Sequence, residues 1–407
     1  MKSKSLIMVT PWVKYVRKAK NEDIYCVSIW KKNEGAENLL QKIVELSDET
    51  YIFDITNYQK LETVIKATLE STHIDYIFHA GREDTMLETY KIAEKYGKAL
   101  NSSNSIAYIN NKLKMRELLE KYTLSPVLYI PIETITELDE ASENFEFPFI
   151  IKPQEMSGSR AVYLCRNNED VSKFKEVVYS YNYLGPFIIE EFLEGPEVSV
   201  EVISNDGIHH VIGITDKIKS APPYFVEMGH IHPSQLDSEA KSNISKVVTD
   251  FLTLAKFTFG PTHTEVILTK NGPRIVESQA RFGGDQIPQL VNLATGIDIE
   301  SLMFKMLNDE PFMPPKKQRV AAISYFSLPM GILKDVSGIS QIQSLPYVQA
   351  ISFTLKPGDN IPQIKDSKTR HGYFIVVGEN HEEVENHKNT VHSLINVEIS
   401  KGNLQIN

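Results

Sequence analysis

The chain has 407 residues and a formal net charge of −10, which predicts roughly two to four domains and argues against a nucleic-acid partner, because phosphate backbones bind basic surfaces. A single nucleotide is not excluded, since it needs only a few well-placed cations. Cys26 and Cys165, the only two cysteines, are typical of small buried residues in a reducing compartment. No apolar run approaches a signal peptide or a membrane span, so we expect a cytoplasmic protein without membrane association.

Short apolar runs alternate with helix-like stretches near the start of the chain, a pattern typical of a parallel α/β sheet. The predicted strands are 6–9, 24–29, 51–55 and 76–78, and the predicted helices are 37–46, 61–69 and 85–96. Ligands of open sheets bind beyond the carboxyl ends of the strands. Arg82, after the last of these strands, is therefore a candidate to hold a substrate carboxylate, although a solvated loop arginine is an equally good interpretation.

The alternation continues through the middle of the chain, and mostly strands and turns follow a proline-rich linker at 311–315. The predicted helices are 110–122, 137–143, 170–179, 234–257, 299–307 and 383–395, the predicted strands are 149–153, 161–164 and 187–191, and 197–203 with 209–216 form a hairpin. Lys152 ends an apolar strand directly before a small-residue loop, 156–160. Its ammonium group could meet phosphate oxygens while backbone N–H groups of the loop close over them.

The segment 263–284 predicts two strands joined by a Lys-Asn-Gly turn, with one acid in each strand. A three-residue loop, 270–272, with Gly272 at positive φ, would place Glu265 directly opposite Glu277. A two-residue Asn-Gly loop would instead place the two acids on opposite faces of the hairpin.

Two facing carboxylates repel each other unless a cation lies between them. Hard oxygen ligands suit Mg²⁺, which usually takes one or two carboxylates plus substrate phosphates. Glu277, Gln279 and Arg281 recur at period two, so an extended chain points all three side chains to one face. The hairpin is thus a candidate floor for a metal and a nucleotide, and solvated acids on half-exposed strands are the alternative interpretation.

Four motifs follow one another in a fixed order between roughly residues 105 and 310. They are Asn111-Lys112 at a helix start, 149–153 with its Ser-Gly loop, the acidic turn 190–197, and Thr264-Glu265 followed by 277–281. In this order and spacing they resemble the ATP-grasp superfamily of carboxylate ligases.

The resemblance implies an α/β protein, α+β in parts, with an ATP-grasp fold and three domains. The implied domains are an N-terminal parallel α/β domain at 1–108, an ATP-grasp region at 109–312 with a lid at about 146–205, and a mostly β C-terminal domain at 313–407. The cofactors implied are ATP and Mg²⁺, with Mn²⁺ as a substitute.

The resemblance also implies residue roles. Phosphate contacts fall to Lys112, Lys152, Ser157, Gly158 and Ser159, adenine contacts to Glu190 and Leu193, the ribose to Glu197, and the metal to Glu265, Glu277 and Gln279. The superfamily more often has asparagine at the position of Gln279.

A closer resemblance is to the bacterial L-amino-acid ligases that make dipeptides, carried by 225–230 and 277–282. In such ligases the residues matching Glu227 and His230 line the amino-acid site, and the one matching Arg281 lies at the acyl phosphate. His230 also has a simpler interpretation, that of a loop histidine in a hydrogen-bond network.

The resemblance therefore implies a ligase that activates an amino-acid carboxylate as an acyl phosphate and joins it to the amine of a second amino acid. Two alternatives stay open: an acceptor that is a carrier-protein thiol or another metabolite amine, and a nucleotide-binding regulator without chemistry. The sequence allows a homodimer and leaves the amino acids, their order and any general base open.

Overall fold

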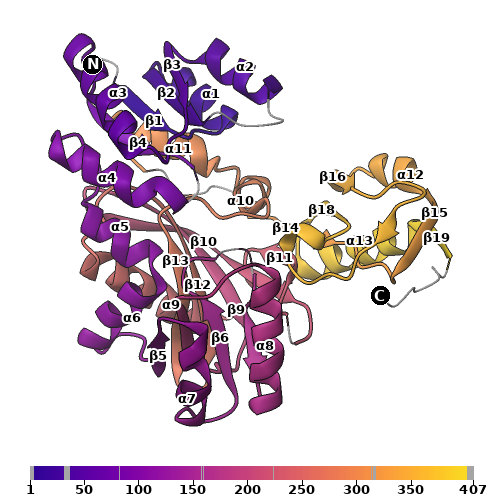
Figure 1. Ribbon diagram of the computed structural model, residues 1–407. Helices are drawn as coiled ribbons and strands as arrows, with labels where there is room; N and C mark the ends of the chain where they lie inside the picture. The colour runs from indigo at the N-terminus through magenta and orange to yellow at the C-terminus, as the bar shows by residue number, and fades with distance from the viewer. Residues whose placement is uncertain are drawn as a thin grey trace.

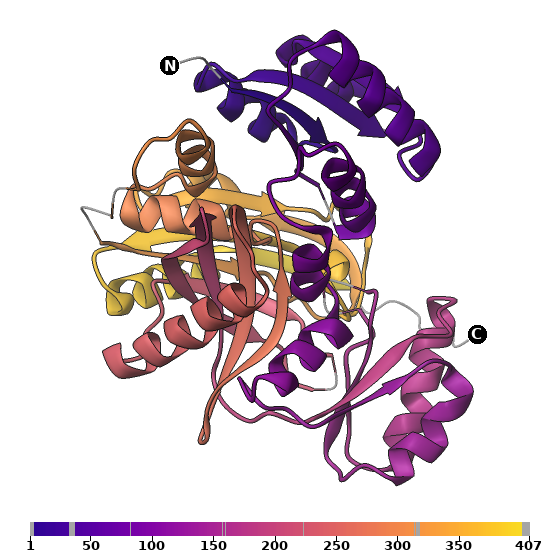
Figure 2. The same cartoon turned by 90° about the vertical axis from the view of Figure 1, so that its left-hand side faces the viewer.

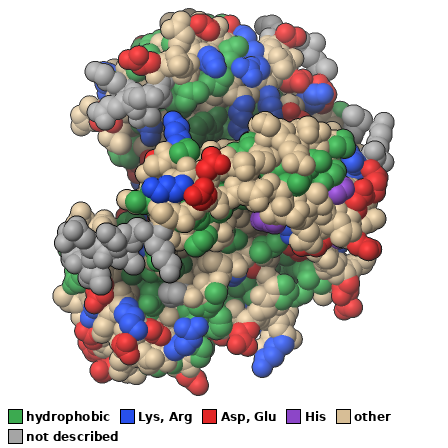
Figure 3. Space-filling model, turned by 90° about the vertical axis from the view of Figure 1, so that its right-hand side faces the viewer, with side chains coloured by type: hydrophobic (Ala, Val, Ile, Leu, Met, Phe, Trp, Pro, Cys, Tyr) green, Lys and Arg blue, Asp and Glu red, His purple; other side chains and the backbone are tan. Residues whose placement is uncertain are grey.

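A computed structural model describes residues 4–31, 37–81, 83–156, 158, 160–222, 224–312, 314 and 318–400. Its strands form four sheets (Figure 1). The N-terminal sheet and a small antiparallel sheet lie at opposite ends of the molecule, with the large sheet between them (Figure 2). Acidic and basic side chains are intermixed on the face that Figure 3 shows. None of the described helices is long and apolar enough to cross a membrane.

The N-terminal sheet is parallel throughout, in the order β3-β2-β1-β4, which confirms the prediction from the alternating pattern. Its elements are β1 (Ser5–Val9), α1 (Val13–Asn21), β2 (Tyr25–Lys31), α2 (Glu37–Leu46), β3 (Glu49–Phe53), α3 (Tyr58–Ser71), β4 (Tyr76–His79), a 3₁₀ turn (Glu83–Thr85) and α4 (Met86–Lys95). The sequence pattern does not predict α1, because lysine and arginine dominate it. Tyr15, Val16 and Ala19 nevertheless give it a narrow buried stripe.

The helix predicted at 110–122 is present but starts two residues later than expected, and a second helix, which the sequence pattern does not predict, ends at Asn110. Helix α5 (Ser103–Asn110) ends there, and α6 (Lys112–Lys121) begins two residues later. Asn111 between them is extended, and its side chain accepts a hydrogen bond of 2.9 Å from the backbone N–H of Lys114. This N-cap fixes Lys112 as the first residue of α6.

The small sheet is antiparallel, in the order β5-β8-β6-β7. Its elements are β5 (Tyr129–Ile132), a 3₁₀ turn (Ile135–Glu137), α7 (Leu138–Glu143), β6 (Phe149–Pro153), β7 (Tyr163–Cys165), α8 (Asn168–Ser180) and β8 (Phe187–Glu191). Phe149, Phe174 and Phe187 are fully buried between its strands and helices. Strands β6 and β8 have the predicted bounds, whereas β7 begins two residues later than predicted.

The large sheet has the order β13-β12-β9-β10-β11-β14-β18-β16. Its strands are β9 (Glu197–Asn205), β10 (Ile208–Lys219), β11 (Glu227–His232), β12 (Gly260–Thr269), β13 (Gly272–Gln279), β14 (Val320–Tyr325), β16 (Val348–Phe353) and β18 (Gly372–Gly378). It is continuous across residue 312, and β9 belongs to it and not to the small sheet. The domain bounds 1–108, 109–312 and 313–407, and the lid at 146–205, stay predictions.

The two faces of the large sheet differ in polarity because side chains alternate along each strand. In β9, Val198, Val200 and Val202 pack against α5, α6 and α9 (Ser238–Leu254). Glu197 and Glu201 point to the opposite face, where polar groups collect. Burial of the apolar face therefore stabilises the sheet, while its other face carries the charged side chains.

The remaining elements complete the C-terminal half. They are α10 (Ile287–Thr295), α11 (Ile299–Leu307), β15 (Gly331–Ser337), α12 (Ile339–Gln343), β17 (Asn360–Ile361), a 3₁₀ turn (Ser367–Thr369), α13 (His381–Leu394) and β19 (Asn396–Ser400). Strands β17, β15 and β19 form the fourth sheet.

The β12–β13 hairpin brings Glu265 opposite Glu277 by a route that the sequence does not predict. Thr269 pairs with Gly272, so the loop has two residues, not the expected three. That register alone would place the acids on opposite faces. A β-bulge at Val276 inserts one extra residue, and beyond it Glu265 pairs directly with Glu277. Gly272 has the expected positive φ, +96°.

One buried histidine in the large sheet predicts a dependence of stability on pH. His232 ends β11, 1% exposed, with its Nδ1 3.0 Å from Thr215 Oγ1. Burial lowers the pKa of His232 from 6.5 to about 4. The unfolded chain binds a proton near pH 6.5 that the folded chain binds only near pH 4, so stability is lost as pH falls through this window.

We predict that, between pH 6 and pH 4.5, the wild-type free energy of unfolding falls by about 1.4 kcal/mol per pH unit more than that of His232→Gln. Urea denaturation at a series of pH values measures both slopes. Parallel slopes in the two proteins would show that His232 does not resist protonation in the folded state.

Candidate active site

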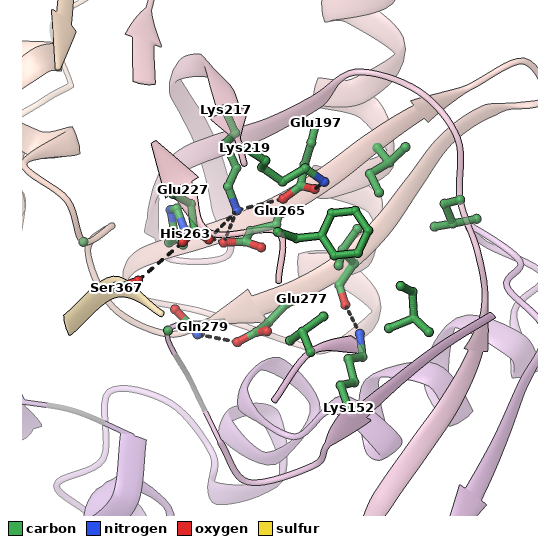
Figure 4. A pocket seen from close by; sticks show the side chains of 18 of the residues that line it. Lys152, Glu197, Lys217, Lys219, Glu227, His263, Glu265, Glu277, Gln279 and Ser367 are labelled. Carbon is green, nitrogen blue, oxygen red and sulfur yellow. Dashed lines mark hydrogen bonds and ion pairs between the residues drawn. The ribbon is translucent and has the colours of Figure 1, made fainter. Parts of the chain in front are cut away.

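A cavity lies between the polar face of the large sheet and the small sheet (Figure 4). Strands β6, β8, β9, β10, β11, β12 and β13 all contribute lining residues, and Ser367 contributes from the C-terminal region. Segments far apart in the sequence thus meet around one space.

One end of the cavity holds a buried cluster of one acid and two cations. Lys152 Nζ lies 2.8 Å from Glu190 Oε2, and Arg116 Nε donates to Glu190 Oε1 at 2.7 Å. Burial opposes the charge on Glu190, but Arg116 and Lys152 lower the pKa of its carboxyl to about 2. Burial lowers the pKa of Lys152, and Glu190 opposes that shift. A phosphate bound at Lys152 would therefore share the ammonium with Glu190.

The same two cations hold the bulge of the hairpin. Arg116 donates to the carbonyl oxygens of Ile275 at 2.6 Å and of Val276 at 3.5 Å. Lys152 donates to the Val276 carbonyl at 3.4 Å. A bulged residue leaves the ladder of strand hydrogen bonds, so its carbonyl needs another partner. The cations supply that partner and fix the register of the acid pair.

The segment after β8 forms a hinge beside an apolar space. Phe192 and Leu193 line the cavity together with Ile150, Ile267 and Val276. The turn depends on Gly195, at φ +148°, since a Cβ there would lie 2.1 Å from the Leu268 carbonyl oxygen. Apolar walls beside hinge backbone groups suit a flat aromatic ring that carries hydrogen-bonding edges.

Lys217 lies where three acids converge (Figure 4). Its Nζ lies 2.7 Å from Glu197 Oε1, 2.7 Å from Glu265 Oε1 and 3.4 Å from Glu227 Oε1. Burial opposes its charge, but these three carboxylates raise the pKa of Lys217 well above its ordinary value. Lys219, two residues on, pairs with the other oxygen of Glu197.

The acids of the hairpin line the middle of the cavity. Glu265 and Glu277 are 22% and 21% exposed, and Gln279 Nε2 donates to Glu277 Oε1 at 2.5 Å. Lys112 Nζ lies 3.4 Å from Glu277 Oε2 and donates to the Met156 carbonyl at 3.1 Å. Burial opposes the charge on Glu265, but Lys217 and His263 hold the pKa of its carboxyl well below the usual value.

His263, two residues before Glu265 on β12, links two acids. Its Nδ1 lies 2.6 Å from Glu201 Oε1, and its Nε2 lies 3.5 Å from Glu265 Oε1. Burial opposes a charged imidazole, but Glu201 and Glu265 raise the pKa of His263 to about 9. Gly283 packs on this pair, since a Cβ there would approach His263 Nδ1 to 2.9 Å. The contacts of His263 and Lys217 both fall on one oxygen of Glu265.

This donor set fits a hard divalent cation that brings phosphates with it. Two partly exposed carboxylates and one amide face the same space, and Mg²⁺ commonly takes one or two carboxylates plus phosphate oxygens and water. Among the described residues, no group of three or more His, Cys, Asp or Glu side chains is placed to hold a metal alone. The protein thus offers only some of the ligands that a metal ion needs, and the phosphates of a nucleotide would supply others.

The far end of the cavity carries mixed polar groups. Glu227 and His230 of β11 and Arg281 after the hairpin line it. Asp285 contacts His230 Nε2 at 3.3 Å, while His230 Nδ1 is buried without a hydrogen-bond partner in the described part of the chain. A buried polar atom without a partner costs roughly 1–3 kcal/mol.

Most of the predicted site residues meet in this one cavity. The lining includes Lys152, Gly158, Glu190, Leu193, Glu197, Glu227, His230, Glu265, Glu277, Gln279 and Arg281. Lys112 is not a lining residue, but it contacts Glu277. Arg82, Ser157 and Ser159 lie outside the described residues. Their roles, and those of the others, stay predictions.

The sequence interpretation missed several residues of the site, chiefly Lys217, His263, Asp285 and Arg370. Lys217 and Lys219 stand at period two on a strand, which is a usable signal that they share a face. No local signal marks Arg370, because its partner Asp285 is 85 residues away.

We predict that Lys217→Met lowers the free energy of unfolding by about 3–5 kcal/mol, because it leaves the buried Glu197 and the partly exposed Glu227 and Glu265 without their shared cation. Lys219→Met is the matched control, since Lys219 is on the same strand and pairs with the same Glu197 but is 25% exposed. It should lose no more than about 1 kcal/mol. Urea denaturation at pH 7 tests both, and equal losses would refute the central role of Lys217.

Comparison with known proteins gives two family matches. Residues 145–289 match the ATP-grasp domain, and residues 324–400 match the L-amino acid ligase C-terminal domain 2. An alanine–anticapsin ligase of Bacillus subtilis is 26% identical over 314 residues, which cover 65% of this chain and 64% of that ligase.

Solved structures show the same fold. The L-amino acid ligase from Bacillus licheniformis has a TM-score of 0.82 at 19% identity and covers 98% of this chain and 100% of its own. A biotin carboxylase domain from Hydrogenobacter thermophilus, solved with MgADP, has a TM-score of 0.67 at 16% identity, over 98% of this chain and 91% of its own. The hinge and the acid hairpin lie within the first family match, so the chain carries an ATP-grasp domain followed by an L-amino acid ligase C-terminal domain, and these matches indicate an ATP-dependent ligase of the L-amino acid ligase type.

Proposed function

We propose that the protein is an ATP-dependent ligase that activates an amino-acid carboxylate as an acyl phosphate and joins it to the amine of a second amino acid. The observation that carries this proposal is that one cavity connects three chemistries. Lys152 offers a cation for phosphate at one end, the facing acids Glu265 and Glu277 offer metal ligands in the middle, and Glu227 and His230 offer polar groups for the substrate at the other end. The family matches over the same residues support it.

Activation is needed because a carboxylate does not react with an amine at neutral pH, since oxide is a poor leaving group. Transfer of the γ-phosphoryl group of ATP to a carboxylate oxygen gives an acyl phosphate and ADP. The amine then attacks the carbonyl carbon, phosphate leaves with that oxygen, and the amine loses a proton. No protein nucleophile is required, and both cysteines are buried.

The residues of the chain would supply fixed charge along this route. Lys152 and Arg281 place positive groups where negative charge builds up on the phosphoryl group and on the tetrahedral oxyanion. A divalent cation held by Glu265 and Glu277 would neutralise phosphate charge and orient the transfer. Lys217 and His263 keep Glu265 ionised while their contacts fall on a single one of its oxygens.

At the far end, Glu227 is suited to a substrate ammonium group, and His230 to a carboxylate or acyl-phosphate oxygen. Strands β6, β7 and β8 of the small sheet, which lie within the predicted lid at about 146–205, would close over the nucleotide and exclude water, which would otherwise hydrolyse the acyl phosphate. The relative named alanine–anticapsin ligase supports the choice of amino-acid substrates.

Glu277→Gln keeps the shape of the side chain and removes one ligand charge, so we predict that ATP turnover falls at least about a hundredfold while the fold persists. Thermal unfolding checks the fold, and coupled ADP assays at saturating Mg²⁺ check turnover. The control is Glu191→Gln, which also lines the cavity but whose carboxylate accepts from the Leu128 N–H. The control should stay within about threefold of wild type. Retention of more than about a third of the turnover in Glu277→Gln would exclude the hairpin as the metal site.

The direct test of the proposed function is phosphate release from ATP with single amino acids and with all pairs, followed by the mass of the products. We predict release that requires two amino acids and yields a dipeptide together with ADP. Release with one amino acid and another amine or a carrier thiol would favour the alternative acceptor. ATP binding without release under any of these conditions would refute ligase activity.

A further inference from the structure

A segment of the C-terminal region reaches the substrate end of the cavity. Ser367 lines it, and its hydroxyl lies 3.4 Å from Glu227 Oε2. Asp366 caps the 3₁₀ turn that carries Ser367, by accepting hydrogen bonds from the backbone N–H groups of Lys368 and Thr369. The turn ends at Arg370, so its geometry also places the guanidinium group.

Arg370 connects three strands or loops around this end of the cavity. Its guanidinium binds Asp285 through two hydrogen bonds, of 2.5 Å and 2.7 Å. It also donates to the Glu227 carbonyl at 3.1 Å and stacks on the Tyr325 ring, with 3.7 Å between Cζ and the ring centroid. A two-point guanidinium–carboxylate contact fixes orientation as well as distance.

Asp285 is held in an unusual backbone conformation. It has φ +48°, and Gln286 after it has φ +62°. Two successive non-glycine residues at positive φ are strained unless their surroundings hold them. Arg370 and His230 bind the Asp285 side chain and so hold this loop against the cavity.

The charges of the two residues cancel at the cavity wall. Asp285 lines the cavity and is 23% exposed, while Arg370 lies behind it at 9% exposure. A substrate side chain that faces this wall therefore meets one acid whose two oxygens are already bound. An uncharged substrate side chain loses no charge hydration at this wall. A charged side chain loses its hydrating water there without gaining a partner of opposite charge.

We propose that Asp285 and Arg370 form a specificity-determining pair that restricts one amino-acid substrate to uncharged side chains. The proposal rests on the proposed ligase function and deepens it. The pair acts as a neutral wall, and its neutrality depends on both members. Removal of either one exposes a charge that a substrate of opposite sign can neutralise.

The experiment compares Arg370→Met, Asp285→Asn and the double variant. Methionine keeps apolar contact with the Tyr325 ring, and asparagine tolerates the positive φ of position 285. Each protein is assayed with alanine fixed at one substrate position and leucine, lysine or glutamate at the other, and then with the positions exchanged. The readouts are kcat/KM for each amino acid and KM for ATP.

In wild type, at one of the two positions, leucine should exceed both lysine and glutamate by at least about tenfold in kcat/KM. Arg370→Met should raise the lysine-to-glutamate ratio by at least about tenfold, and Asp285→Asn should lower it by a similar factor. The double variant should return this ratio to within about threefold of wild type, while KM for ATP stays within about twofold throughout. Opposite shifts are the decisive result, because loss of structure would lower all substrates alike.

The matched control is Arg319→Met, which removes an ion pair of 2.9 Å with Glu379 outside the cavity lining. Its lysine-to-glutamate ratio should equal that of wild type. If both single variants keep the wild-type ratio, or shift it in the same direction, the pair does not set specificity. A wild type whose ATP turnover ignores amino acids would overturn the proposed function, and with it this role, in an assay that needs no variant.

Discussion

One buried ammonium group, that of Lys217, holds the site together. It contacts Glu197, Glu265 and Glu227, which come from three different strands and are proposed to serve the ribose, the metal and the substrate. Without a shared cation, these carboxylates would repel one another in a poorly hydrated space. The relative positions of three proposed subsites therefore depend on this buried positive charge, which Lys219 supplements at Glu197 and His263 supplements at Glu265.

A second constraint is geometric. The register set by the two-residue loop would place Glu265 and Glu277 on opposite faces of the hairpin. They face each other only because a bulge at Val276 shifts that register by one residue. The bulge is stable because Arg116 and Lys152 bind its carbonyl while they also bind Glu190. The cluster at Glu190 and the acid pair are thus parts of one network of hydrogen bonds. A nucleotide that displaced Lys152 would therefore change contacts of Glu190 and of the bulge together.

Features that depend on local sequence patterns are predicted correctly. Alternation gives the parallel N-terminal sheet, and period two places Glu277 and Gln279 on one face, where the structure has them. The sequence analysis correctly places Glu265 opposite Glu277, but it does so from a three-residue loop that the structure does not have. The bulge that produces this pairing cannot be recognised in a single sequence. Long-range partners are not predicted: nothing near Asp285 in the chain reveals that the guanidinium group of Arg370, after the 3₁₀ turn Ser367–Thr369, will bind it.

The anchored bulge divides the hairpin into two parts that follow different registers. Pairs from Thr269 with Gly272 to Val266 with Ile275 follow one register, and pairs from Glu265 onward follow another. Arg116 and Lys152 fix the bulge from outside the hairpin, so the contacts that hold the acid pair in place do not involve the tip at 270–271. Substitutions that keep the tip at two residues should therefore leave the acids in place, whereas a longer or shorter loop would change the register that the bulge offsets.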